Sequence, residues 1–144
     1  MPLWREGELE PDQIAGDVAA GLFFLAECSA EGSNDAAGML KFQLEDPVFW
    51  PDVSHDNAAY VHRLAVRRRY AGRGLSFELL RWATDRTLAS GRQFLRLDFE
   101  ASRPRLREIY ERFGFLHHSD AQIGSYLVSR YQYDVTSGAS GGIR

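Results

Sequence analysis

The sequence predicts a mixed α/β fold, in which helices pack around a single central sheet. Two observations support this prediction. First, the chain has 144 residues and is 44% hydrophobic, which suits one domain with its own core. Second, apolar residues at helical spacing alternate along the chain with short runs typical of strands. The expected order is a helix, two antiparallel strands, a strand, a helix, a strand, a helix and two final strands.

The first expected elements are a short helix and a hairpin. Residues 11–20 place Ile14 and Val18 four positions apart behind a proline and an aspartate, which favours a helix. Residues 21–28 form an apolar run typical of a buried strand. Polar and apolar side chains alternate over residues 37–46, which indicates a strand with one solvent-exposed face. A polar turn separates these two strands, so we expect them to pair as a hairpin.

The second half of the chain predicts strands and helices in turn. The predicted ranges are strands at 59–66, 93–99, 115–118 and 125–135, and helices at 75–90 and 103–113. Each helix has an apolar face, formed by Leu75, Leu79, Leu80, Ala83, Thr87 and Leu88 in the first and by Leu106, Ile109, Tyr110 and Phe113 in the second. Gly91 and Gly114 follow the two helices and are expected to end them.

Two segments are predicted to lie outside the regular elements. Residues 47–58 form a loop with two prolines and two large aromatic residues, Phe49 and Trp50. Aromatic residues in a loop either cover the core or line a pocket, and both interpretations stay open. Residues 136–144 are poor in apolar side chains, so we expect a flexible tail there. The sequence thus predicts one domain over residues 1–135.

Charge along the chain argues against a nucleic-acid partner. The net charge is -3, whereas proteins that coat DNA or RNA usually carry a basic excess. Positive charge is instead local, because six arginines and one acid, Glu78, lie between His62 and Arg81. A local basic cluster on an acidic protein favours a small anionic ligand over a long polyanion.

The location predicted from the sequence is the cytoplasm, with no membrane partner. Cys28 is the only cysteine, so an internal disulfide is excluded, and its apolar surroundings predict an inert core thiol. The N-terminus lacks the pattern of a signal peptide. The chain also lacks an apolar run approaching the roughly 18 to 20 residues of a membrane span.

The stretch "AVRRRYAGRGLS", residues 65–76, lies between a predicted strand and a predicted helix. A helix begins with backbone N–H groups that lack internal partners, and glycines before it allow a ligand to approach the main chain. This context favours a phosphate site built from backbone amides. The lysine of a P-loop and the third glycine of a dinucleotide fingerprint are both missing. The alternative is a tight connection that binds nothing.

Two blocks resemble the GNAT N-acetyltransferase family. "LAVRRRYAGRGLSFELL" resembles its acetyl-CoA-binding segment, and "LRLDFEASRPRLREIYERFGF" resembles its second hallmark, a strand and a tyrosine-bearing helix followed by Gly-Phe. The resemblance implies the GNAT acyl-CoA N-acyltransferase fold, an α/β (α+β type) arrangement with a mixed central sheet of about six strands flanked by three helices. The usual first strand and helix of that fold are not recognised in this sequence.

This incomplete start leaves one strand without a neighbour in the expected sheet. The strand at 22–28 would become an edge, and its apolar run makes a poor exposed edge. We therefore expect a homodimer partner or a rearranged N-terminal segment to cover it. The alternative is that the chain is a shortened form of a longer protein.

The resemblance implies that acetyl-CoA is the cofactor. The implied cofactor-binding residues are Leu64, Ala65, Val66, Arg67, Ala71, Gly72, Arg73, Gly74, Leu75, Ser76 and Arg103. Three of them depart from the family pattern. Ala71 stands where arginine or glutamine is usual, and Ser76 occupies the last small position. Arg103 replaces a frequent asparagine, and either reaches a cofactor phosphate or is solvated.

The activity that the resemblance implies is acetyl transfer from acetyl-CoA to a primary amine. Tyr110 matches the family's tyrosine, which protonates the departing thiolate, although it also belongs to the buried face of its helix. The Val66 amide is a candidate oxyanion donor. His62 matches a histidine of the aromatic-alkylamine branch and is a candidate base. Its alternative is a half-buried strand histidine. Tyr60 would share a strand face with His62.

The acceptor is expected to be a small-molecule amine or a peptide. Phe49, Trp50 and Tyr60 are the candidate substrate-binding residues, and Asp52 and Asp56 add acidic character that suits a cationic amine. The four histidines lack the regular spacing of a metal site, so none is assigned. An alternative function is a CoA-binding module with little or no catalytic activity.

Overall fold

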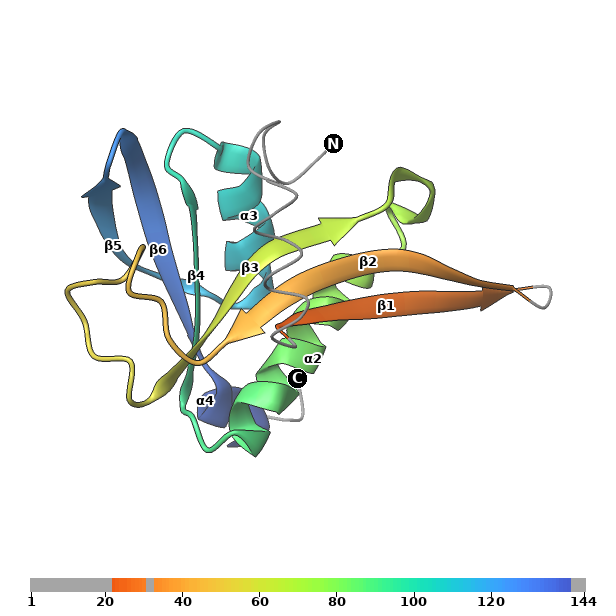
Figure 1. Cartoon of the computed structure of the whole chain (residues 1–144), viewed down its shortest axis with the longest axis horizontal. Coiled ribbons are helices and arrows are strands. Elements are labelled where there is room, and N and C mark those ends of the chain that lie inside the picture. Colours follow the sequence, from red (N-terminus) through yellow and green to blue (C-terminus); the bar gives the residue numbers. More distant parts are fainter. Residues whose placement is uncertain (1–21, 31–32, 141–144) are drawn as a thin grey trace. The chain divides into compact units, whose positions relative to one another are not determined.

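The computed structural model describes residues 22–30 and 33–140 (Figure 1). The helix predicted at 11–20 and the predicted burial of the Cys28 side chain lie outside what is described. Among these residues six strands form one mixed sheet, as the family resemblance implied, and their order is β1-β2-β3-β4-β6-β5. The strands are β1 (Phe23–Ala30), β2 (Ser33–Gln43), β3 (Ala58–Val66), β4 (Phe94–Glu100), β5 (Leu116–Ile123) and β6 (Tyr126–Asp134). The helices are α2 (Leu75–Ala89), α3 (Pro104–Phe113) and α4 (Val135–Ser140), with a 3₁₀ turn, η1, at Arg68–Tyr70.

The described residues divide into two compact units. The first contains the chain up to Phe42 together with His62–Trp82, and the second contains Gln43–Val61 and the chain from Ala83 onward. Strand β3 and helix α2 each contribute to both units, because the boundaries fall within them. Among the described residues, no helix is long and apolar enough to cross a membrane.

The first unit contains the predicted hairpin. Strands β1 and β2 are antiparallel (Figure 1), with Phe23 opposite Lys41 and Ala30 opposite Ser33. Side chains from the hairpin pack on helix α2, where the Trp82 ring lies 4.6 Å from Phe24 and 6.0 Å from Phe42 between centroids. Strand β2 begins earlier than predicted, because its pairing with β1 continues almost to the turn.

The second unit packs helix α3 on strands β4 and β6, which are antiparallel. Leu106 and Tyr110 are buried, as the predicted apolar face required. Gly114 ends the helix with a φ of 125°, a conformation that glycine adopts most easily.

Three details of the second unit differ from prediction. Strand β5 continues to Ile123 rather than ending at 118, because it pairs with β6 along its length. Helix α4 occupies residues at which the tail was expected to begin. Leu88 is 38% exposed, although Ala83 and Thr87 are fully buried. It lies about 100° around the helix from Thr87, which places it beside the buried face.

Candidate functional site

The glycine-rich turn of the first unit joins strand β3 to helix α2. After β3 the chain forms η1, in which the Tyr70 amide donates to the Arg67 carbonyl at 2.9 Å. Gly72 and Gly74 follow with φ of 79° and 74°, the left-handed region that favours glycine. The Glu78 amide donates to the Gly74 carbonyl at 3.1 Å. This bond begins the helix, so helix geometry leaves the first amides after Gly74 without an intrahelical acceptor.

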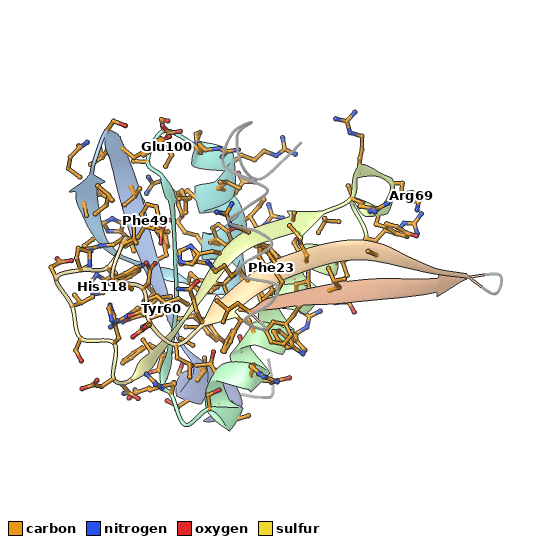
Figure 2. The ribbon with its side chains drawn as sticks, in the orientation of Figure 1. Phe23, Phe49, Tyr60, Arg69, Glu100 and His118 are labelled. Carbon is orange, nitrogen blue, oxygen red and sulfur yellow. The ribbon has the colours of Figure 1, made fainter. Side chains whose placement is uncertain are left out.

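The turn also carries a high density of positive charge. Arg67, Arg68, Arg69 and Arg73 are exposed, and Figure 2 shows Arg69 on the turn that follows β3. The guanidinium carbons of Arg69 and Arg73 lie 5.4 and 5.5 Å from the centre of the Tyr70 ring. These distances allow cation–π contacts. Tyr70 thus holds two arginines near the start of α2, a role that the sequence analysis did not assign to it.

Gly38 is a second residue of this unit that the sequence analysis missed. A Cβ at this position of β2 would lie 2.8 Å from the Ala65 carbonyl oxygen and 3.1 Å from Leu79 Cδ1. Glycine therefore allows β2 to lie close to the end of β3 and to α2. The Arg67 amide donates to the Ala37 carbonyl at 2.8 Å, which continues this contact to the turn. A glycine inside a strand pattern is a known signal of close backbone approach and was present in the sequence.

Strand β3 changes character along its length. Within the second unit it runs parallel to β4, with Ala58 opposite Phe94, Ala59 opposite Leu95 and Tyr60 opposite Arg96. Both strands continue beyond these residues. Arg63 has a φ of 54°, which is unusual for a non-glycine residue in a strand.

His62 and Leu64 lie on either side of Arg63 in the first unit. Leu64 is buried and His62 is half-buried. Simple alternation along the strand predicted that Tyr60 and His62 share one face. The left-handed conformation at Arg63 interrupts the alternation between His62 and Leu64, so spacing no longer predicts that these two share a face. The shared face of Tyr60 and His62 stays a prediction. The role of His62 as a base stays a prediction.

Tyr110 belongs to the second unit and is 6% exposed. Its ring lies 5.6 Å from Phe99 and 5.9 Å from Phe115 between centroids. Burial raises the pKa of Tyr110, the negative charge of Asp98 raises it further, and Arg103 opposes both. The phenol is therefore protonated at neutral pH, as a proton donor must be.

The loop between β2 and β3 is built around Trp50. Trp50, Ala58 and Tyr60 form a buried cluster, with Phe49, Val53 and Phe94 packed against it. Trp50 and Tyr60 are both 0% exposed, and Arg96 Nη1 donates to the Tyr60 hydroxyl at 2.8 Å. Figure 2 shows Phe49, Tyr60 and His118 near one another in this unit. Of the two interpretations of the loop aromatics, Trp50 fits the core, and neither Trp50 nor Tyr60 is accessible to an acceptor in this conformation.

The acidic residues of the same loop also have structural partners. Arg130 binds Asp52 through two hydrogen bonds, of 2.6 and 3.1 Å. The hydrogen bond from Arg130 lowers the pKa of Asp52 to about 2. Asp46 is buried, and its Oδ1 accepts from the Phe49 amide at 3.0 Å. The charge of Asp52 is thus balanced by Arg130, which weakens the expectation that it attracts a cationic acceptor.

The remaining predicted residues are distributed between the units. Arg103 precedes helix α3 in the second unit, whereas the other predicted cofactor residues lie in the first. His117 and His118 are exposed. His117 Nε2 lies 2.8 Å from Asp120 Oδ1, and the His118 ring lies 5.1 Å from Trp50.

The mixed sheet and the strand–turn–helix segment at Gly72 and Gly74 are those of an acyltransferase fold. The model of the acetyltransferase (GNAT) family matches residues 2–115. The chain therefore belongs to the GNAT acetyltransferase family.

Known relatives agree with this membership. The chain is 39% identical over 70 residues to the uncharacterized N-acetyltransferase YesJ of Bacillus subtilis, which is 49% of this chain and 39% of that relative. It thus spans about two fifths of YesJ. A GNAT acetyltransferase from Listeria monocytogenes superposes with a TM-score of 0.74 and 25% identity, over 89% of this chain and 73% of that one. A structure of yncA from Salmonella typhimurium, described as a putative acetyltransferase with its cofactor acetyl-CoA, gives a TM-score of 0.63 and 16% identity, over 93% and 79% of the chains.

Proposed function

We propose that the protein is an N-acetyltransferase, which transfers an acetyl group from acetyl-CoA to a primary amine within a ternary complex. The observation that carries the proposal is the turn before α2, where Gly72 and Gly74 adopt left-handed φ angles in a segment matched by the family model. Backbone amides at a helix start suit a pyrophosphate. The exposed arginines beside them suit the cofactor's remaining charge.

The cofactor would lie along the end of β3 and the turn. Leu64, Ala65 and Val66 would meet its pantetheine arm, and the turn from Arg67 to Ser76 would meet its phosphates. The replacement of arginine or glutamine by Ala71 removes a side chain but no backbone amide, and Ser76 keeps a small side chain. Binding through main chain therefore tolerates both departures. Arg103 would add a phosphate contact.

The reaction requires two proton transfers. The neutral amine attacks the acetyl carbonyl carbon, a new C–N bond forms, and the C–S bond to coenzyme A breaks. His62 accepts the proton that the amine loses, directly or through water, and the Val66 amide stabilises the oxyanion. Tyr110 donates its proton to the departing thiolate, which a buried and protonated phenol can do. Bulk solvent then restores the tyrosine.

The acceptor in this proposal is a small-molecule amine or a peptide in the cytoplasm. Phe49 is the member of the predicted substrate-binding set that keeps partial exposure, so it is the residue of that set that we propose to contact the acceptor. Trp50 and Tyr60 would act indirectly, because they belong to the buried cluster against which Phe49 packs.

Thiol release measures the proposed reaction directly. The protein is incubated with acetyl-CoA and a panel of aryl-alkylamines, polyamines, aminoglycosides and short peptides, and free thiol is followed with a chromogenic disulfide. We expect release that depends on an amine and falls about 100-fold in Tyr110→Phe, within the usual contribution of general acid catalysis. Cofactor binding without amine-dependent release across the panel would favour the CoA-binding module instead.

A further inference from the structure

A buried tyrosine on strand β6, Tyr131, joins that strand to helix α3. Its hydroxyl lies between two charged side chains of the helix. Tyr131 is 0% exposed. Its hydroxyl accepts a hydrogen bond from Arg107 Nη1 at 2.8 Å and donates one to Glu111 Oε2 at 2.6 Å. Arg107 and Glu111 are one helical turn apart, and Tyr110 lies between them on the same helix. One hydroxyl on strand β6 thus fixes the turn of helix α3 that carries Tyr110.

An aromatic stack links the same two tyrosines. The Tyr131 ring lies 5.2 Å from Phe99 at an interplanar angle of 33°, and the Phe99 ring lies 5.6 Å from Tyr110 at 32°. The Arg107 guanidinium lies 5.7 Å from the centre of the Phe99 ring. Rings in such a stack cannot shift independently, because interiors are close-packed. The position of Tyr131 therefore restricts the position of the Tyr110 ring.

The hydrogen-bonded network continues from α3 to strand β5. Arg107 Nη2 donates to Ser129 Oγ at 3.1 Å, and Ser129 Oγ donates to Asp120 Oδ1 at 2.9 Å. Because Ser129 and Tyr131 are both fully buried, these polar groups depend on one another for partners. The network is thus well suited to hold one side chain in a fixed place.

We propose that Tyr131 is a positioning residue, which holds Tyr110 through Arg107, Glu111 and Phe99 in the orientation needed to protonate the coenzyme A thiolate. This inference rests on the proposed acetyl transfer. Proton donation requires the donor within hydrogen-bond reach of its acceptor, and a small displacement of a catalytic group lowers the rate steeply. Tyr131 itself does not touch the reacting atoms.

The test compares Tyr131→Phe with the unmodified protein, using acetyl-CoA and whichever amine of the panel gives the fastest thiol release. The substitution keeps the ring and removes the hydroxyl that joins Arg107 to Glu111. We expect kcat to fall about tenfold, with KM for acetyl-CoA within about twofold. In a Tyr110→Phe background, Tyr131→Phe should have no further effect on kcat, because the Tyr110 hydroxyl through which Tyr131 acts is already absent.

Two further variants separate positioning from general stability. Glu111→Ala removes the hydroxyl's acceptor at an exposed position and should also lower kcat, whereas Glu111→Gln restores an acceptor and should recover most of the activity. Arg112→Ala breaks an exposed ion pair with Glu108 on the same helix and should leave kcat unchanged. Glu111→Ala keeps the test decisive if Tyr131→Phe does not fold.

The outcomes distinguish this inference from the proposed function. A full rate for both Tyr131→Phe and Glu111→Ala, beside a strong loss in Tyr110→Phe, would overturn the positioning role alone. An undiminished effect of Tyr131→Phe in the Tyr110→Phe background would also overturn it. If no amine supports turnover, NMR of the protein with Cζ-labelled tyrosine tests whether Tyr131 positions the Tyr110 ring. A changed Tyr110 resonance in Tyr131→Phe supports the coupling, and an unchanged one overturns it.

Discussion

At the scale of single residues, burial keeps the phenol of Tyr110 protonated. A tyrosine at the surface has a pKa near 10, but Tyr110 is enclosed by Phe99 and Phe115 and lies near the negative charge of Asp98. All of these favour the neutral phenol. Tyr110 therefore packs in the core and also keeps its phenolic proton. Its structural and catalytic interpretations are compatible.

The raised pKa of Tyr110 predicts a loss of stability in alkali. Above about pH 10 the unfolded chain ionises this phenol while the folded chain keeps the proton. Stability from this group is therefore complete below the unfolded pKa and is lost as pH rises toward the folded one. We expect the free energy of unfolding, measured in urea between about pH 8 and pH 11, to decline less steeply in Tyr110→Phe.

Other buried tyrosines limit the size of this effect. Burial also raises the pKa of Tyr60 and of Tyr131, so some decline in alkali should persist in Tyr110→Phe. An identical slope in Tyr110→Phe and in the unmodified protein would show that Tyr110 ionises normally in the folded state.

At the scale of elements, the start of helix α2 depends on how closely strand β2 approaches β3. Gly38 permits this approach, because any side chain there would meet the Ala65 carbonyl oxygen. Backbone oxygens cannot rotate away as side chains do. The close approach of β2 to the end of β3 and to α2 therefore depends on the missing side chain at Gly38.

Gly38→Ala should weaken both folding and cofactor binding. We expect a loss of about 1–3 kcal/mol in the free energy of unfolding, typical of overpacking, and a several-fold weaker affinity for acetyl-CoA, measured by calorimetry. Gly91→Ala is the matched control. Gly91 has a φ of 75° with open space around its Cβ position, so the substitution strains the backbone by about 1 kcal/mol without changing that affinity. If Gly38→Ala and Gly91→Ala bind acetyl-CoA with equal affinity, the close packing at Gly38 does not affect cofactor binding at the turn.

At the scale of the whole molecule, periodicity and glycine spacing predicted most of the element order. The hairpin, the two longer helices and the strands of the second unit follow from local pattern, because each buries a face whose period matches its geometry. The glycine-rich turn was also predictable, since its residues are consecutive. Among the described strands, β1 lies at the edge of the sheet, as expected from the family resemblance, and what covers it stays a prediction.

Contacts between distant segments could not be predicted in this way. Trp50 is buried by Tyr60, Arg96 and Arg130, which come from three different strands, so its loop gave no local sign of burial. The same holds for Tyr131, whose partners lie on helix α3. The left-handed φ of Arg63 could not be predicted either, because no glycine or other sequence signal marks that position. Residues whose roles depend on such contacts were therefore missed.

Calorimetric titration of acetyl-CoA into the unmodified protein and into Gly74→Glu tests the central claim most directly. A glutamate at Gly74 places a side chain on a residue with a φ of 74° and a negative charge beside the proposed pyrophosphate. We predict saturable binding to the unmodified protein and at least about tenfold weaker binding to the variant, or about 1.4 kcal/mol. Gly124→Glu, at a glycine with a φ of 58° in the β5–β6 turn, should bind normally. Equal affinity of Gly74→Glu and the unmodified protein would contradict the assignment of this turn as the cofactor site.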